Sequence, residues 1–282
     1  MLVRGARAGH PRIHATAWED GQVRRLESAV NSVAGRLGLQ VSRIGPAAAQ
    51  LPVEASSDDA ARISALRPFT MTSATRLWSL VRAVRYLESE GIGGDFVECG
   101  VWRGGSVMAM AGELARLGAG DRKIWLYDTF SGMTDPSSRD VEAVSGTPAQ
   151  QLMDTTPVGD GNNVWCVAGM DDVRANVATT GYPMDQFVFV EGDVAETLQT
   201  HAPERVALLR LDTDWYESTK VSLTQLFPKL AIGGVCILDD YGHWQGARDA
   251  VDEYFAERDY QPLMFPIDFS GRILIKSREI PH

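Results

Sequence analysis

The sequence is poor in cysteine and has no long hydrophobic run. Its three cysteines, Cys99, Cys166 and Cys236, are odd in number and far apart, and they form no Cys-x-x-Cys pair. This pattern favours reduced thiols in a cytoplasm over a disulfide scaffold. The longest nearly apolar run is Leu230–Leu238, much shorter than the roughly 18 residues that would suggest a membrane span. We therefore expect no membrane partner.

An excess of positive charge is also absent. The chain has 27 Lys and Arg against 37 Asp and Glu, a formal net charge of −10 at pH 7. A nucleic-acid-binding protein would need a local basic patch, which we do not find. The first residues include arginines but no apolar core of a secretory signal, so we do not expect export. With 44% hydrophobic residues, the composition is that of a globular protein with a small-molecule partner.

Residues 1–60 differ from the rest of the chain. Apolar residues at steps of three and four predict an amphipathic helix: Val23, Leu26, Val30, Val33 and Leu37. The stretch 44–52, rich in alanine and proline, is typical of a linker. We therefore predict an N-terminal helical extension and linker over 1–60, followed by one domain over 61–282. The extension either packs on that domain or forms a subunit contact, and the second possibility predicts a homo-oligomer, a dimer or tetramer.

Beyond residue 70, short apolar runs alternate with helical periods. An amphipathic helix comes first, with Thr72 or Ser73 placed to cap it, and its apolar residues are Leu77, Leu80, Val81, Val84 and Leu87. Strands are predicted at Asp95–Cys99, Ile124–Asp128, Phe187–Val190, Val206–Asp212 and Val235–Leu238, with helices near 105–117, 218–230 and 245–257. This alternation predicts an α/β fold with a mainly parallel sheet. The tail predicts a closing antiparallel hairpin from Pro262–Ile267 and Arg272–Lys276.

The segment 131–165 is rich in Gly, Pro, Ser, Thr and Asp, and it is longer than ordinary α/β connections. It follows the second predicted strand, so it should rise from the carboxyl edge of the sheet, where open α/β folds bind ligands. We predict a lid-like insertion over a substrate. A plain surface insertion is the alternative.

A glycine-rich loop lies where the first predicted strand gives way to a helix, over Glu98–Ser106. Glycines let the backbone approach a ligand, and the first amides of a helix present donors to a carboxylate or phosphate. The glycines fall at 100, 104 and 105, so the dinucleotide fingerprint G-x-G-x-x-G is not met, which argues against an NAD enzyme. The loop predicts either a ligand site or a tight turn with no ligand.

Acidic residues follow the next two strands. Asp128 closes the second strand, where a carboxylate can accept hydrogen bonds from ribose hydroxyls, and Asp193 lies just beyond the third. One bound nucleoside would meet all three strand ends. Alone, each acid is more often a helix cap or a solvated loop residue.

A second acidic group follows the fourth and fifth strands. Asp212 and Asp214 end the fourth strand, and Asp239 and Asp240 end the fifth. Carboxylates brought together at one sheet edge repel one another, and a hard divalent cation relieves that repulsion. Oxygen-only ligands favour Mg²⁺ or Mn²⁺ over zinc. The alternative is that Asp214 and Asp240 cap helices and the other acids are solvated. His243, three residues after Asp240, is either a base or substrate contact or a structural histidine.

Five motifs occur in order between about residues 60 and 276. They read TMTS at 70–73, FVECGV at 96–101, YDTFSGM at 127–133, RLDTDWYEST at 210–219 and LDDY at 238–241. Together they resemble the macrocin O-methyltransferase family, whose members methylate sugar hydroxyls on macrolide and aminocoumarin antibiotics. The resemblance implies a class I fold that uses S-adenosylmethionine and a divalent metal, usually Mg²⁺.

The resemblance also implies roles for individual residues. Those implied to bind the cofactor are Met71, Thr72, Glu98, Gly100, Ser106, Asp128, Ser131 and Asp193. Within this set, Asp128 would contact the ribose and Asp193 the adenine. The family's metal positions fall on Asp212, Asp239 and Asp240.

The expected chemistry is methyl transfer to a small-molecule acceptor with vicinal hydroxyls. A metal that grips two neighbouring hydroxyls lowers the pKa of one of them and orients it. Asp212 is the first candidate for the base that takes the proton, followed by Asp214 and His243. A sugar of a natural-product glycoside or glycolipid is the expected acceptor, and a phenol or catechol is the alternative. A metal-dependent glycosyltransferase would explain the D-x-D of 212–214 but would leave Asp128 without a role.

Overall fold

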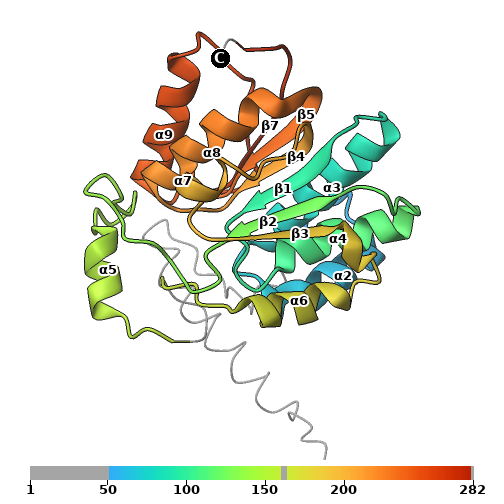
Figure 1. The fold of residues 1–282 in the computed structure, drawn as a ribbon, viewed down its shortest axis with the longest axis horizontal. Helices are drawn as coiled ribbons and strands as arrows, with labels where there is room; N and C mark the ends of the chain where they lie inside the picture. The colour runs from blue at the N-terminus through green and yellow to red at the C-terminus, as the bar shows by residue number, and fades with distance from the viewer. Residues whose placement is uncertain (1–50, 160–163, 281–282) are drawn as a thin grey trace, which may run out of the picture. The chain divides into compact units, whose positions relative to one another are not determined.

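The structure, a computed structural model, describes residues 51–159 and 164–280. A seven-stranded sheet runs through this part of the chain in the order β3-β2-β1-β4-β5-β7-β6 (Figure 1). The strands are β1 Asp95–Cys99, β2 Ile124–Asp128, β3 Phe187–Glu191, β4 Val206–Leu211, β5 Leu230–Leu238, β6 Phe265–Pro266 and β7 Arg272–Ile275. Strands β1 to β5 are parallel, and β7 pairs antiparallel with β5 and β6. The predicted α/β fold with its closing hairpin is confirmed.

Helices cover both faces of the sheet (Figure 1). One face carries α2 Ser57–Leu66, α3 Ala74–Ser89, α4 Gly105–Leu117 and α6 Met170–Ala178, and the other carries α7 Val194–Thr197, α8 Tyr216–Leu226 and α9 Gln245–Ala256. Each face has its own buried apolar cluster. Within the described ranges, no helix is long and apolar enough to cross a bilayer.

The first predicted amphipathic helix of the domain is α3. All five apolar residues that marked it in the sequence are buried, and the Oγ of Ser73 accepts from the backbone N–H of Arg76 as an N-cap.

Helix α8 ends earlier than predicted, at Leu226 rather than near residue 230. The helix ends there because Pro228 has no N–H to continue the helical hydrogen bonds. Pro228 lies instead in a short 3₁₀ turn. Strand β5 therefore begins at Leu230, earlier than predicted.

The carboxyl ends of β1, β4 and β5 lie side by side. The backbone N–H of Asp212 donates to the Cys99 carbonyl, and that of Asp239 donates to the Leu211 carbonyl, both at 2.9 Å. Since β1 lies between β2 and β4, the strand order reverses here, and ligands of open α/β sheets bind at such a point. The fold thus brings the glycine loop and the acidic strand ends to one edge.

The segment 131–165 includes a helix, α5 Ala149–Thr155, where the sequence predicted a loop. Its anchor is Asp140, which is 1% exposed. The Asp140 carboxylate accepts from the backbone N–H groups of Ser137 and Tyr216, both at 2.7 Å. An isolated bridge pairs Glu142 with Trp244. The described part of the insertion is therefore attached to the N-terminal ends of α8 and α9.

The helix predicted at 23–37 lies outside the described residues, as does the linker predicted at 44–52 apart from its last two residues. The N-terminal extension, and the homo-oligomer inferred from it, stay predictions.

Candidate active site

A cavity of about 420 Å³ opens at the carboxyl edge of the sheet. Most of the residues singled out in the sequence line it: Met71, Thr72, Glu98, Gly100, Ser106, Asp128, Asp212, Asp214, Asp239, Asp240 and His243. Asp193 lines a smaller cavity of about 60 Å³, which shares Gly100, Asp128 and Asp212 with the first. Ser131 is exposed and lines neither cavity.

The glycine-rich loop is held by its neighbours on the edge. Gly100 has a φ of +82°, and a Cβ there would lie 1.8 Å from the carbonyl oxygen of Asp212, so only glycine fits. The Oδ2 of Asp128 accepts from the backbone N–H groups of Val101 at 2.7 Å and Trp102 at 3.0 Å. Asp128 thus organises the loop between β1 and α4. The N-cap of α4 is Gly104, which provides no side-chain acceptor for the first amides.

A buried arginine joins the two halves of the edge. Arg210 on β4 is 1% exposed and donates to four side chains. It pairs with Glu98, with the Oδ2 of Asp212 at 2.8 Å, with the Oδ1 of Asp239 at 2.5 Å and with the Thr72 hydroxyl at 2.7 Å. Arg210 therefore links the residues predicted for the cofactor to those predicted for the metal.

Arg210 received no predicted role from the sequence, although its position contains a signal. Residues two apart on a strand point to the same face, so Arg210 and Asp212 share one. An arginine inside an otherwise apolar buried strand needs an acidic partner. Glu98 is that partner by register, because it lies opposite Arg210 in the β1–β4 pairing.

Glu98 has one oxygen left over. Its Oε2 is buried and has no hydrogen-bond partner among the described residues. Burial raises the pKa of Glu98 to about 8, although the Arg210 charge acts in the opposite direction. An unpaired carboxylate oxygen at a cavity wall suits a cationic ligand group such as an ammonium, which would complete its hydrogen bonding.

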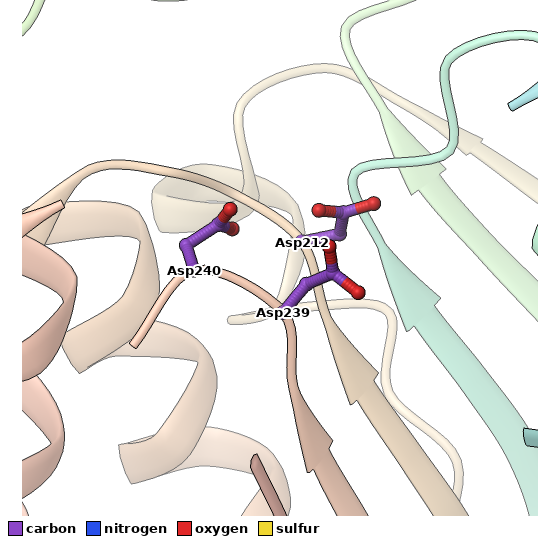
Figure 2. A group of neighbouring side chains, drawn as sticks. All are labelled: Asp212, Asp239 and Asp240. Carbon is purple, nitrogen blue, oxygen red and sulfur yellow. The ribbon is translucent and has the colours of Figure 1, made fainter. Parts of the chain in front are cut away.

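Three carboxylates meet at the ends of β4 and β5 (Figure 2). One oxygen from each of Asp212, Asp239 and Asp240 lies within 4.8 Å of the others. Burial, together with the neighbouring carboxylates, raises the pKa of Asp212 to about 6 and holds the pKa of Asp240 well above its usual value. A set of oxygen donors with excess negative charge fits Mg²⁺ or Mn²⁺. The predicted convergence of these acids is present in the structure.

Asp214 lies next to this group with different contacts. Its φ is +60°, an uncommon conformation for a residue other than glycine. The indole N–H of Trp244 donates to its Oδ1 at 2.7 Å. Burial and the charge of Asp212 raise the pKa of Asp214 to about 7. His243 also lines the cavity, where burial lowers its pKa.

The insertion supplies an apolar wall beside the acids. Met133, Leu152 and Val164 line the cavity and pack against a buried cluster that includes Trp215 and Trp244. The two indole rings meet edge to face with centroids 4.8 Å apart. A ligand at this end of the cavity would contact apolar surface on one side and carboxylates on the other.

Comparison with known proteins identifies the family. The sequence pattern of the macrocin-O-methyltransferase (TylF) family matches residues 21–275. The chain belongs to this macrocin O-methyltransferase family. The chain is similar to demethyldecarbamoylnovobiocin O-methyltransferase of Streptomyces niveus, with 35% identity over 202 residues that cover 72% of this chain and 73% of the relative.

Two further known proteins are similar to the chain. The 8-demethyl-8-(2,3-dimethoxy-alpha-L-rhamnosyl)-tetracenomycin-C 4'-O-methyltransferase of Streptomyces olivaceus is 36% identical over 202 residues, again covering 72% of this chain and 73% of the relative. The solved structure of the O-methyltransferase NovP has a TM-score of 0.65 and 33% identity, covering 74% of this chain and 83% of that chain. The protein is therefore an O-methyltransferase with the class I fold, as the motifs predicted, and the glycosyltransferase alternative is excluded.

Proposed function

We propose that the protein transfers the methyl group of S-adenosylmethionine to a sugar hydroxyl of a natural-product glycoside or glycolipid, with the help of Mg²⁺ or Mn²⁺. The observation that carries this proposal is the single cavity that joins the glycine loop, the unpaired oxygen of Glu98 and the three converging carboxylates. The names of two relatives, which refer to novobiocin and to a rhamnosyl tetracenomycin, support a glycosidic acceptor.

The cofactor would lie along β1 and β2. The unpaired Oε2 of Glu98 would accept a hydrogen bond from its ammonium, and the uncapped amides at the start of α4 would donate to its carboxylate. Asp128 and Asp193, which border the smaller cavity, serve the ribose and the adenine. This placement leaves the half of the cavity beside Asp214 and Trp244 for the acceptor.

Asp212, Asp239 and Asp240 would hold the metal ion. When bound, the ion supplies positive charge that lowers the pKa of an acceptor hydroxyl. The surrounding wall of Trp215, Trp244 and the insertion keeps water away from this hydroxyl, which strengthens electrostatic effects there.

The contacts favour Asp214 over Asp212 as the base. Asp212 accepts a hydrogen bond from the Arg210 guanidinium, and a carboxylate paired with a cation holds a proton weakly. Asp214 accepts from the neutral indole of Trp244 instead. Asp214 would take the hydroxyl proton, while the cofactor would supply the methyl group to the acceptor oxygen and leave as S-adenosylhomocysteine. His243 is the second candidate for this role.

Methyl transfer from labelled S-adenosylmethionine to a panel of acceptors tests the proposal. We expect turnover with glycosides that carry vicinal hydroxyls, loss of turnover with EDTA, and recovery with Mg²⁺. Turnover that is unchanged by EDTA would remove the metal from the proposal. Turnover with catechols and with none of the glycosides would replace the sugar by a phenolic acceptor.

A further inference from the structure

Arg76 is a second arginine at the metal edge, and neither the motifs nor the proposed reaction give it a role. It lies on α3, lines the cavity, and its side chain is 16% exposed. Its Nη1 donates to the Oδ2 of Asp239 and, at 3.3 Å, to the Asp239 carbonyl oxygen. Since Arg210 already donates to Oδ1, both oxygens of Asp239 are held by guanidinium groups.

The turn between β6 and β7 holds Arg76 from the other side. The Oδ2 of Asp268 accepts from the Nε of Arg76 at 3.0 Å and from the Ser73 hydroxyl at 2.6 Å. The Oδ1 of Asp268 accepts from the backbone N–H of Gly271 at 2.7 Å. A Cβ on Gly271 would lie 2.6 Å from the Cδ of Arg76. The guanidinium is therefore fixed between Asp268 and Asp239.

The same turn also contacts the backbone of Asp239. The Ser270 hydroxyl donates to the Asp239 carbonyl oxygen at 2.6 Å, and the backbone N–H of Gly242 donates to the Ser270 carbonyl at 2.9 Å. A Cβ on Gly242 would lie 2.0 Å from the Phe269 carbonyl oxygen. The turn thus contacts the backbone at Asp239 and again at Gly242, two residues after Asp240.

We propose that Arg76 and Asp268 are positioning residues that orient Asp239 for a divalent cation. The inference rests on the proposed metal site and concerns residues that do not themselves contact the ion. Each carboxylate oxygen has two lone pairs, so an oxygen that accepts from a guanidinium can still ligate a metal. Hydrogen bonds of this kind fix a ligand's orientation, and losing one weakens metal affinity by about 10–100-fold.

A purely electrostatic account makes the opposite prediction. A guanidinium beside a cation site repels the cation, so its removal alone would tighten metal binding. The direction of the change on replacing Arg76 therefore separates orientation from charge.

The test is a titration of the full-length protein with Mn²⁺, in which electron paramagnetic resonance measures the unbound ion. We expect Arg76→Gln to raise the Mn²⁺ dissociation constant about 10–100-fold and Asp268→Asn to raise it about tenfold. Arg82→Gln is the matched control, because Arg82 lies on the same helix, is exposed, and stacks on Trp78 away from the acids. It should bind Mn²⁺ like the wild type.

Asp240→Asn separates this inference from the proposed metal site. If the wild type binds no Mn²⁺, or if Asp240→Asn binds it unchanged, the metal site itself fails and the inference fails with it. If Asp240→Asn loses Mn²⁺ while Arg76→Gln binds it as tightly as the wild type or more tightly, only the positioning role is overturned. Unchanged affinity in Asp268→Asn would remove Asp268 from the pair.

Discussion

The domain contains two groups of acids and arginines that differ in charge balance. One, the helix cluster, joins α2, α3 and α4 and consists of Asp59, Arg62, Arg85, Glu113 and Arg116. Its two acids are 3% and 0% exposed, and three guanidinium groups surround them. Burial alone would raise the pKa of Glu113, but hydrogen bonds from the arginines lower it to about 2.

The other group, the edge cluster, has the opposite balance. Two arginines, Arg76 and Arg210, lie among five of the acids that line the cavity, which are Glu98, Asp212, Asp214, Asp239 and Asp240. Here burial raises the pKa values of Glu98 and Asp214 to about 8 and about 7. In the helix cluster both acids are paired with arginines, whereas the edge cluster has an excess of acids over arginines. Cationic ligands would satisfy that excess, which is why we place both the cofactor's ammonium and the metal there.

The largest predicted effect concerns the base. Asp214→Asn removes the proton acceptor and should lower kcat by about 10²–10⁴-fold. Mn²⁺ affinity should stay near the wild-type value, because Asp214 is not among the three proposed ligands. Single-turnover kinetics and a Mn²⁺ titration measure the two quantities. Asp212→Asn is the comparison variant, and it should lose both turnover and metal affinity. Normal turnover in Asp214→Asn would mean that Asp214 is not the base, and His243 would become the candidate.

The next effect tests the completeness of the helix cluster. Glu113→Gln leaves three guanidinium groups with Asp59 as the remaining buried acid, and removing one partner of a buried ion pair costs about 3–5 kcal/mol. Urea unfolding at pH 7 measures the loss. Because the helix cluster is remote from the cavity lining, folded Glu113→Gln should keep wild-type kcat. A change below about 1 kcal/mol, the range of exposed pairs, would contradict the charge balance that we assign to this cluster.

The two clusters should respond to pH with opposite signs. The folded-state pKa of Glu113 is depressed, from 4.5 to about 2, so its contribution to stability is present above about pH 4.5 and is lost as pH falls toward 2. The folded-state pKa of Glu98 is raised, from 4.5 to about 8. The metal-free, cofactor-free protein should therefore lose stability at Glu98 as pH rises across that interval.

Melting temperatures of Glu113→Gln and Glu98→Gln, each measured against the wild type, separate the two slopes. The deficit of Glu113→Gln should shrink on acidification from pH 5 to pH 3. Glu98→Gln should gain on the wild type between pH 5 and pH 9. Parallel curves for the two variants would mean that the clusters do not differ in charge balance.

Local sequence pattern was sufficient for the sheet and for its acidic edge. Strands of a parallel sheet are buried on both faces, so they appear as short apolar runs, and polar residues such as Asp128 and Asp239 mark where they end. The motifs singled out Glu98 and Asp212, which line one cavity in the structure. Strand ends at the same edge of a sheet lie close together regardless of the conformation of the connecting loops.

Contacts between distant segments could not be predicted in this way. Arg76 and Asp268 are 192 residues apart, and Arg62 and Glu113 are 51 apart. No local periodicity connects such pairs, because their contact depends on how helices pack on the sheet. Helix α5 was missed for a related reason, since a segment rich in turn-forming residues gave no helical period. Ser131 was assigned to the cofactor because it lies in the motif at 127–133. The residue is exposed and lines neither cavity, so its role stays a prediction.

The smallest effect tests whether the leftover oxygen of Glu98 serves the cofactor. Glu98→Gln removes a carboxylate that a bound ammonium would keep ionised, and it leaves Arg210 bonded to Asp212, Asp239 and Thr72. We expect S-adenosylhomocysteine to bind about tenfold more weakly, equivalent to about 1.4 kcal/mol, as measured by calorimetry without metal. Glu113→Gln is the matched control, because the same substitution outside the cavity should leave this affinity unchanged. If Glu98→Gln binds S-adenosylhomocysteine like the wild type, Glu98 serves only to hold Arg210, and the excess charge of the edge cluster belongs to the metal alone.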